Sequence, residues 1–481
     1  MKKTKKSVGR VYTPPHVVVN ILNLCGYNGT KILGKHIIDN SCGDGAFLIQ
    51  VVKRYCDAAK LDGLSCDQIS RDLEKYIHGI DIDLNETEKC RKNLDIAAAQ
   101  YGIINVNWDI ICGNSLSIKH FDGKMDFVVG NPPYVRVHNL DENYAAVKQY
   151  NFAQGGMTDL YIVFYEVGLK MLALNGVLGY ISPSSWFNSL AGSIMRKHLY
   201  TQKNIHTIVD LKHYQPFSEA TTYTAIAILT ACQNNHVKYY EYGEESLTPH
   251  YITELEYEDI ATKNSFVFEK REALVTLKTV KEYAAINPVF TVKNGFATLF
   301  DGFFIGDWDF ESYTIPAVKA STGKATKCIF PYDNNGNILP YETLTQNADV
   351  KKHYEQHTEK LKKRALGKDA PWHGFGRSQG IKDVYKQKYA INTLIRNVAD
   401  IKLHPCPLGT GVYSGLYILT KLDFAVLQDM LLTDDFVDYI AMLGKYKSGG
   451  YYTFSSKDLS QYLNYKYTER NGFKNEQHTI S

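Results

Sequence analysis

Short apolar runs alternate with helical patterns through the first half of this chain. Such alternation is typical of an α/β fold, in which helices cross over between the strands of a parallel sheet. Seven segments are expected to be strands: Ile37–Ser41, Tyr76–Asp83, Val106–Gly113, Asp126–Asn131, Gly176–Ser182, His206–Lys212 and Thr222–Thr230. Four segments are expected to be helices: Ala46–Lys60, Glu86–Tyr101, Asp159–Leu174 and Ser184–Tyr200. The sequence therefore predicts a doubly wound, mostly parallel, seven-stranded α/β sheet in a domain over residues 1–240.

The residue pattern changes near residue 240. A polar, acidic stretch begins at Tyr239 and lacks the α/β alternation, so residues 241–285 are expected to connect two domains. From residue 286 the chain is rich in Gly, Tyr, Phe and Lys, with strand-like runs at Tyr389–Ile395 and Gly411–Leu419 and a helical pattern at Leu422–Leu443. Residues 286–481 are expected to form a second, mixed α+β domain.

Charge is nearly balanced over the whole chain, with 54 Lys+Arg against 51 Asp+Glu. Residues 351–390 differ, because they hold 11 Lys+Arg and only 4 Asp+Glu. A solvated helix face and a surface that contacts phosphates both explain this local excess, and the sequence does not choose between them.

Several classes of protein are disfavoured by the sequence. No apolar run approaches the ~18 residues of a membrane span, and the basic first residues are followed by polar ones instead of the apolar core of a signal peptide. The nine cysteines form no C-x-x-C pair and no His/Cys ligand spacing. We expect a cytoplasmic protein that uses no metal and no membrane.

A glycine turn follows the first expected strand. Ile37–Phe47 reads as a strand, then Gly43-Asp44-Gly45, then a helix. Glycines permit a sharp bend and a close approach of backbone to ligand, and the helix N-terminus offers free N–H groups. The third glycine of a dinucleotide fingerprint is absent, since Leu48 stands there, which argues against an NAD domain. A tight turn without any ligand is the alternative.

Two carboxylates, Asp81 and Asp83, end the second expected strand. A carboxylate at this position can accept both hydroxyls of a ribose. Taken alone, the pair is equally well explained as a helix cap before Asn85. Together with the glycine turn, it indicates an adenosine-containing ligand across the switch point of the sheet.

Asn131-Pro132-Pro133-Tyr134 follows the fourth expected strand. Two successive prolines hold the turn stiffly extended. The Asn131 side-chain oxygen and the Pro132 carbonyl can bind both hydrogens of a conjugated amino group and favour the geometry that frees its lone pair, while Tyr134 stacks on the planar substrate. Such an amino group can be methylated by a sulfonium compound. Because a sulfonium methyl donor is already activated, this reaction requires no general base. A rigid structural turn is the alternative.

These motifs, in this order, resemble those of the γ-group N6-adenine DNA methyltransferases of restriction–modification systems. Val11–Pro15 is similar to the family's N-terminal cofactor motif, Gly113–Leu116 to its adenine-contacting segment, and Thr158–Tyr161 to its fifth segment. This chain departs from the pattern at Asn114, where the family usually has Asp, and at Asn40, which replaces a common Pro. Gln215–Ser218 resembles the segment whose Phe packs on the flipped base, although Phe217 is also explained as a core residue.

The resemblance implies S-adenosyl-L-methionine as cofactor and double-stranded DNA as substrate, with a possible cognate restriction endonuclease acting separately. Implied cofactor-binding residues are Tyr12, Thr13, Pro14, Asp39, Ser41, Gly43, Gly45, Asp81, Ile82, Asn114, Ser115 and Asn131. Implied catalytic residues are Asn131, Pro132, Pro133, Tyr134 and Phe217.

The second half resembles the family's target-recognition region more loosely, through the segments Val292–Phe296, Trp372–Gln379 and Gly411–Gly415. Basic residues interleaved with Tyr, Phe and Trp fit a DNA groove. Methylation of a protein glutamine or an RNA base by the same Asn-Pro-Pro-Tyr chemistry remains the alternative function. The long C-terminal half argues against a compact protein-glutamine methyltransferase, and the intact motifs argue against a non-catalytic DNA-recognition subunit. A fused endonuclease is not expected.

Overall fold

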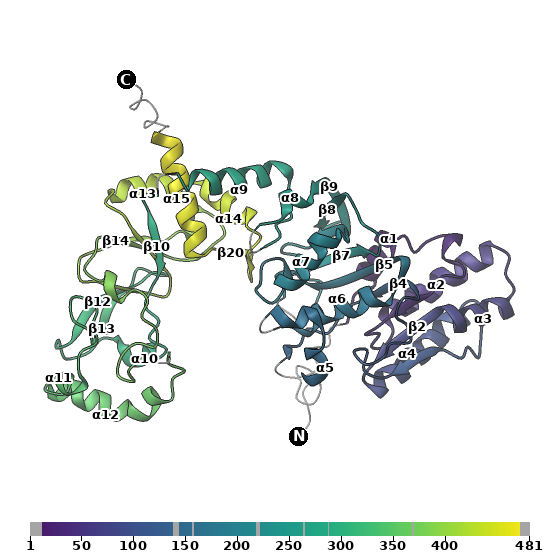
Figure 1. Cartoon of the computed structure of the whole chain (residues 1–481), viewed down its shortest axis with the longest axis horizontal. Coiled ribbons are helices and arrows are strands. Elements are labelled where there is room, and N and C mark those ends of the chain that lie inside the picture. The colour runs from purple at the N-terminus through teal and green to yellow at the C-terminus, as the bar shows by residue number, and fades with distance from the viewer. Residues whose placement is uncertain are drawn as a thin grey trace. The chain divides into compact units, whose positions relative to one another are not determined.

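The computed structural model describes residues 12–137, 144–155, 158–217, 222–262, 265–286, 288–367 and 370–471. The chain divides into two compact units, the first ending at Leu274 and the second beginning at Val275 (Figure 1). Among the described residues, no helix combines the length and the apolar character needed to cross a membrane.

The first unit is built on one sheet in the order β3-β2-β1-β4-β5-β7-β6-β8-β9. Its strands are β1 (Ile37–Asp39), β2 (Ile77–Asp81), β3 (Asp109–Cys112), β4 (Met125–Gly130), β5 (Leu172–Pro183), β6 (Ile205–Asp210), β7 (Thr224–Thr230), β8 (His236–Gly243) and β9 (Thr248–Glu256). The pairs from β3 to β5 are parallel, and β7 runs antiparallel to both β5 and β6. Each of the seven segments expected to be strands overlaps one of the strands β1 to β7.

The sheet has nine strands rather than the expected seven, because β8 and β9 extend it. β8 crosses the expected end of the domain at residue 240, and β9 lies in the segment expected to be a connector. They form an antiparallel pair at the sheet edge. Only Val237, Tyr239 and Tyr242 of β8 are buried, and Leu255 is the one buried residue of β9. An edge hairpin with one apolar and one polar face has a largely polar sequence, which is why the α/β alternation is invisible there.

Helices cover both faces of this sheet. The unit contains α1 (Pro15–Leu24), η2 (Thr30–Ile32), α2 (Ala46–Leu61), α3 (Cys66–Tyr76), α4 (Leu84–Ala99), α5 (Tyr144–Lys148), η5 (Asn151–Gly155), α6 (Leu160–Met171), η6 (Ser184–Phe187), α7 (Ser193–Gln202) and α8 (Tyr257–Ile260). Neighbouring strand residues point to opposite faces, so Ile37 packs in the core under α1 to α4 and Ile38 in the core under α6 and α7. The expected helix over 184–200 is two elements, η6 and α7.

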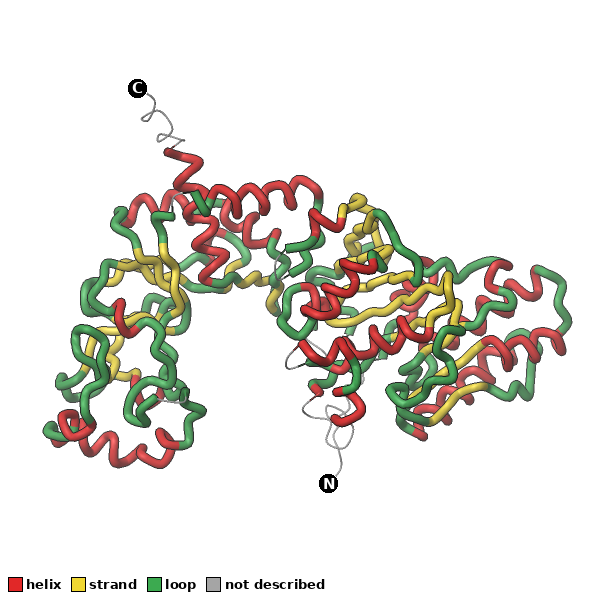
Figure 2. Tube along the Cα trace, viewed as in Figure 1, coloured by secondary structure: helices red, strands yellow, loops and turns green. Residues whose placement is uncertain are grey.

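The second unit has short strands joined by long loops (Figure 2). Its sheets are β10-β18-β14-β16, β11-β13-β12-β17 and β15-β20-β19. The strands are β10 (Thr291–Asn294), β11 (Ile305–Gly306), β12 (Thr314–Lys319), β13 (Ala325–Ile329), β14 (Lys388–Ile391), β15 (Leu394–Ile395), β16 (Leu403–Cys406), β17 (Gly411–Tyr413), β18 (Leu416–Leu419), β19 (Tyr446–Lys447) and β20 (Tyr451–Thr453).

The helical elements of this part of the chain are α9 (Arg271–Tyr283), α10 (Asp301–Phe304), α11 (Tyr341–Leu344), α12 (Ala348–Lys362), η7 (Ile381–Asp383), η8 (Val398–Asp400), α13 (Phe424–Leu431), α14 (Asp434–Met442) and α15 (Ser456–Asn471). Helix α9 runs across the unit boundary. The single helix expected over 422–443 is the pair α13 and α14, because the Thr433 hydroxyl accepts the Phe436 N–H and starts a new helix.

Candidate functional site

Strands β2, β1 and β4 lie side by side and run parallel, so the loops that follow them meet at one edge of the sheet. Asp39 is in register with Gly79 on β2 and Val129 on β4. Two residues further along each strand stand Ser41, Asp81 and Asn131. Binding sites of open α/β sheets lie at this edge, and three residues expected in the site are brought there by register alone.

The glycine turn is a left-handed backbone held against helix α4. Gly43 and Gly45 have φ of +51° and +95°. A Cβ on Gly45 would lie 2.9 Å from the Cys90 Sγ, whereas one on Gly43 would meet no atom within 4 Å. The turn therefore requires glycine at 45 for both conformation and space, and the backbone at Gly43 faces open room.

Asp81 and Asp83 make different contacts, and the helix-cap interpretation is confirmed for Asp83. Asp81 accepts the Gly43 N–H at 3.0 Å through Oδ2 and the Asp83 N–H at 2.9 Å through Oδ1. Asp83 accepts the Asn85 N–H at 2.8 Å and caps α4. Ile82 between them is 57% exposed.

Asp39 at the end of β1 is a buried carboxyl, only 2% exposed. It accepts the Ser41 N–H at 3.0 Å, and Gly130 approaches so closely that a Cβ there would lie 2.8 Å from its Oδ1. Burial, aided by the nearby Asp81 and Asp44 carboxylates, raises the pKa of Asp39 to about 8 against the opposing Ser41 hydrogen bond. This edge of the sheet thus concentrates acidic groups, an environment suited to a cationic ligand.

The segment after β3 closes one side of the site. The Asn114 Oδ1 accepts the Leu116 N–H at 3.0 Å, and the buried Ser115 donates its hydroxyl to the Asn40 carbonyl at 2.6 Å. The Tyr180 hydroxyl donates to the Asn40 Oδ1 at 2.7 Å. Asn40, fully buried, therefore connects β1 to β5 and to this segment. Sequence reasoning noted Asn40 only as a departure from a family pattern and missed its connecting role.

The N-terminal motif lies on the same site. Pro14 is the N-cap residue of α1, and the buried Thr13 accepts the Asn131 Nδ2–H at 3.2 Å. Tyr12 is 51% exposed and donates its hydroxyl to Glu86 at 3.3 Å. Val11 lies outside the described residues. Sequence reasoning did not single out Glu86 as a contact of Tyr12. A signal was present, since a Glu three residues after an N-cap residue such as Asp83 marks a helix start.

The Asn131–Tyr134 turn positions two aromatic rings. Tyr134 and Phe217 meet edge to face with ring centroids 6.3 Å apart, and Tyr134 meets Tyr161 in the same way at 6.3 Å. The Tyr134 hydroxyl is buried without a hydrogen-bond partner in the described part of the chain. Burial raises the pKa of this hydroxyl well above its ordinary value, so the phenol stays neutral.

Phe217 is 4% exposed and belongs to the core of the first unit. The structure thus agrees with the core interpretation of this residue and also places its ring beside the Asn131–Tyr134 turn. Ser218 of the same motif lies outside the described residues.

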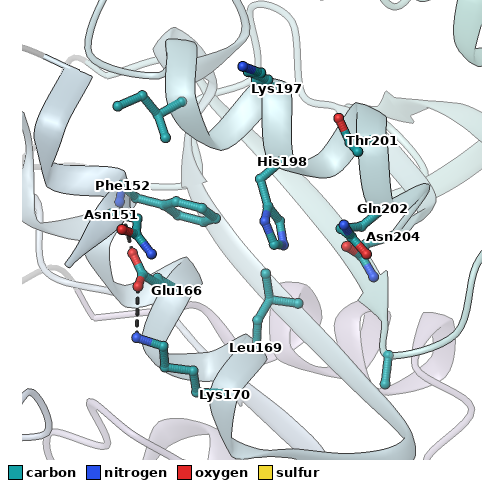
Figure 3. Close-up of a pocket in the computed structure, with 12 residues that line it drawn as sticks. Asn151, Phe152, Glu166, Leu169, Lys170, Lys197, His198, Thr201, Gln202 and Asn204 are labelled. Atoms are coloured by element: carbon teal, nitrogen blue, oxygen red, sulfur yellow. Dashed lines mark hydrogen bonds and ion pairs between the residues drawn. The ribbon is translucent and has the colours of Figure 1, made fainter.

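A separate cavity of about 660 Å³ lies between α6, α7 and η5 (Figure 3). Phe152, Leu169 and Ile194 supply apolar walls, and His198 and Lys197 face it from α7. None of the residues expected in the functional site lines it. It is therefore distinct from the edge of the sheet described above.

The residues at the sheet edge fit a cationic, adenosine-containing cofactor. The fit rests on the clustered carboxyl groups, on the open space at Gly43 and on the exposed apolar Ile82 beside Asp81. Among the described residues no group of three or more His, Cys, Asp and Glu side chains is arranged to hold a metal.

In the second unit, the three segments that resemble a target-recognition region meet although up to about 120 residues separate them. Phe296 donates its N–H to the Val412 carbonyl at 2.7 Å, and Gly295 donates to Gly415 at 3.0 Å. Arg377 donates its N–H to the Ala297 carbonyl at 3.1 Å. Backbone hydrogen bonds therefore hold the three segments side by side.

Comparisons with known proteins find relatives of the first unit and similar folds for the whole chain. Residues 46–217 match the Eco57I restriction-modification methylase family. The type II methyltransferase M.BstVI of Geobacillus stearothermophilus is 32% identical over 235 residues, which cover 46% of this chain and 42% of that protein. The type II restriction enzyme and methyltransferase RM.Eco57I of Escherichia coli is 27% identical over 285 residues, 48% of this chain and 29% of that protein. This chain thus spans less than half the length of either relative.

A similar fold occurs in the type IIL restriction-modification enzyme MmeI, solved in complex with DNA. The TM-score is 0.62 at 14% identity, and the match covers 96% of this chain and 68% of that one. The likeness extends over both units and concerns the fold. The family and the methyltransferase relatives support S-adenosylmethionine as the cofactor.

Proposed function

We propose that this chain is a site-specific DNA adenine methyltransferase, which transfers a methyl group from S-adenosylmethionine to N6 of an adenine flipped out of duplex DNA. The observation that carries the proposal is Asn131-Pro132-Pro133-Tyr134 at the end of β4, in register with Asp81 on β2 and beside the glycine turn. The methyltransferase relatives of restriction–modification systems support it.

Asn131 and Pro132 are assigned to the target amine. An adenine amino nitrogen is a poor nucleophile because its lone pair is delocalised into the ring. The Asn131 side-chain oxygen and the Pro132 carbonyl would accept its two hydrogens and stabilise the tetrahedral geometry, which is catalysis by positioning and electrostatics. Pro132 and Pro133 keep this backbone extended, and the Thr13 contact holds the Asn131 side chain against the N-terminal motif.

The cofactor would lie over the glycine turn. Bound S-adenosylmethionine supplies a methyl group on a positively charged sulfur. Asp81 is assigned to the ribose hydroxyls, Ile82 and Tyr12 to the adenosine surface, and Asp39 to the electrostatic field around the cation. Asn114 and Ser115 shape the far wall of the same site through their bonds to Leu116 and Asn40.

The aromatic pair is assigned to the flipped base. Flipping costs a few kcal/mol, and stacking on an aromatic ring returns about 1–3 kcal/mol. Tyr134 is assigned to stack on the extruded adenine. Phe217, whose ring meets Tyr134 edge to face at 6.3 Å, would support the Tyr134 ring and close the apolar side of the base pocket.

Duplex DNA is the proposed partner, and the second unit is assigned to target recognition because basic and aromatic segments converge there. A cognate restriction endonuclease acting as a separate protein is part of the proposal. The alternative, methylation of a protein glutamine or an RNA base, uses the same Asn131 chemistry and gives a different product.

The test is to incubate the full chain with tritiated S-adenosylmethionine and duplex DNA, then to separate the nucleosides. Radioactive N6-methyladenine in wild type, lost in Asn131→Ala, would support the proposal. Label in N4-methylcytosine, in RNA or in protein, with none in adenine of DNA, would contradict it.

A further inference from the structure

The loop Trp372–Gln379 of the second unit is held by hydrogen bonds against the segment Gly295–Thr298. Gly376 donates its N–H to the Thr298 carbonyl at 3.1 Å, and the Gln379 Nε2–H donates to the Gly295 carbonyl at 2.7 Å. On the inner side, Phe375 is buried and packs on Phe296 at 4.9 Å. The loop backbone is therefore fixed, while Arg377, Ser378 and Gln379 are exposed.

The Arg377 guanidinium is exposed and forms no ion pair with a carboxylate among the described residues. It donates to two backbone carbonyls, those of Ala365 and Gly376, both at 3.1 Å. An exposed arginine on a fixed backbone, five residues after the aromatic Trp372, differs from the flexible surface lysines of a solvated helix. Rigid presentation of this kind is what recognition of a defined partner requires.

Leu299 adds a strained apolar residue to the same surface. It has φ of +59°, a conformation that bulky side chains rarely adopt, and is 44% exposed. A Cβ on Gly376 would lie 2.4 Å from the Leu299 side chain, so the two residues are in close contact. Strained residues cluster at binding sites, and this exposed leucine lies against Gly376, the residue before Arg377.

Lysines stand close in sequence to this loop and to the segment on which it packs. Lys293 and Lys386 both pair with the Asp383 carboxylate at 2.7 Å, and Lys382 is exposed next to Asp383. The three lysines around Asp383 thus outnumber its single carboxylate. Such a surface fits a polyanion.

We propose that Leu299, Arg377 and Gln379 read base edges in a groove of duplex DNA, with Lys382 and its neighbours contacting the flanking phosphates. This inference rests on the proposed function and names the surface that selects the site. Arginine binds guanine through O6 and N7, glutamine pairs with adenine, and an apolar tip contacts the thymine methyl group. Phosphate contacts fix the register without reading sequence.

The experiment uses the full chain and two readouts. Binding is measured against a duplex containing the recognised site and a scrambled duplex, over a range of salt. The methylated motif is read by sequencing DNA from cells that express each variant. The variants are Arg377→Ala, Arg377→Lys, Lys382→Ala and, as a matched control, Lys457→Ala, which removes one exposed charge from α15. Thermal unfolding checks that each variant folds.

Arg377→Ala should weaken binding to the recognised site by roughly 5- to 150-fold and leave the affinity for the scrambled duplex within about threefold of wild type. The methylated motif should become less specific at one base position. Arg377→Lys keeps the charge without the bidentate fork and should also relax the motif. Lys382→Ala should weaken binding to both duplexes equally. It should also lower the slope of log affinity against log salt concentration by about one. Lys457→Ala should change neither.

The inference is overturned if the Arg377 variants keep the wild-type motif and affinity, or if wild type binds no duplex DNA. Tighter binding to RNA or to an acidic peptide than to duplex DNA also overturns it. The proposed function fails separately, if wild type selects a DNA site but transfers no methyl group to adenine. The binding comparison still tests the Arg377 surface in that case.

Discussion

Gly43 donates its backbone N–H to the Asp81 carboxylate at 3.0 Å, so the glycine turn after β1 and the acid that ends β2 form one unit. The two residues lie 38 positions apart in the sequence. Any change to Asp81 therefore acts on the backbone of the turn as well as on a bound ribose.

Asp81→Ala should weaken the affinity for S-adenosylmethionine by roughly 10- to 150-fold, because a hydrogen bond to a charged group is worth about 1.5–3 kcal/mol. Asp83→Ala is the matched control. It removes the α4 cap at a cost of about 1 kcal/mol in stability and should leave the affinity nearly unchanged. Calorimetric titration of both variants checks this, and equal losses of affinity would assign Asp81 to a structural role alone.

Gly45→Ala should destabilise the first unit more than Gly43→Ala. Both place a side chain at positive φ, which costs about 1–2 kcal/mol, but only the residue 45 methyl group collides with Cys90. Thermal or urea unfolding of the two variants measures the difference. If Gly43→Ala were the more harmful, the packing against α4 would not be what restricts this turn.

Asp39 should make the unliganded protein less stable as the pH rises. Its folded pKa of about 8 lies above the 3.8 of an exposed aspartate, so between these values the folded state binds more protons than the unfolded state. Stability from this group is therefore greatest below pH 4 and falls until pH 8. In Asp39→Asn, the pH dependence of the unfolding free energy should be shallower by up to about 1.4 kcal/mol per pH unit. Identical profiles for variant and wild type would contradict the assigned pKa.

Cofactor binding should release a proton, since a cation near Asp39 favours its ionised form. Titration calorimetry at pH 7 in two buffers with different ionisation enthalpies detects that release. In Asp39→Asn, cofactor binding should no longer release this proton.

The methylation rate of Tyr134→Phe should remain within several-fold of wild type, because the hydroxyl has no hydrogen-bond partner in the described residues. Tyr134→Ala should lose about one to two orders of magnitude in rate, since stacking is worth about 1–3 kcal/mol and each 1.36 kcal/mol is tenfold. The fluorescence of 2-aminopurine at the target position reports the flipped population. Equal impairment of both variants would show that the hydroxyl matters and that stacking is the wrong explanation.

Much of the first unit could be predicted because its strands and turns are determined by residues that are neighbours in the sequence. Apolar runs located all seven central strands, and residue type marked the glycine turn and the Asn131 turn. What sequence could not reveal is long-range pairing. The bond from Tyr180 to Asn40 spans 140 residues, and neither residue type requires the other.

The errors have equally physical causes. Strands β8 and β9 bury few side chains, so their sequence is polar. Thr433 splits one apolar stretch into two helices by capping the second. In the second unit, the meeting of Gly295, Arg377 and Gly415 depends on backbone hydrogen bonds, which leave no trace in residue identity.

The most direct test of the account is methyl transfer by Asn131→Ala, measured together with cofactor affinity. The account assigns the side-chain oxygen of Asn131 to the target amine and the glycine turn and Asp81 to the cofactor. Asn131→Ala should therefore lose nearly all tritium transfer to adenine in duplex DNA while binding S-adenosylmethionine within a few-fold of wild type. Near-normal turnover by this variant would contradict the account.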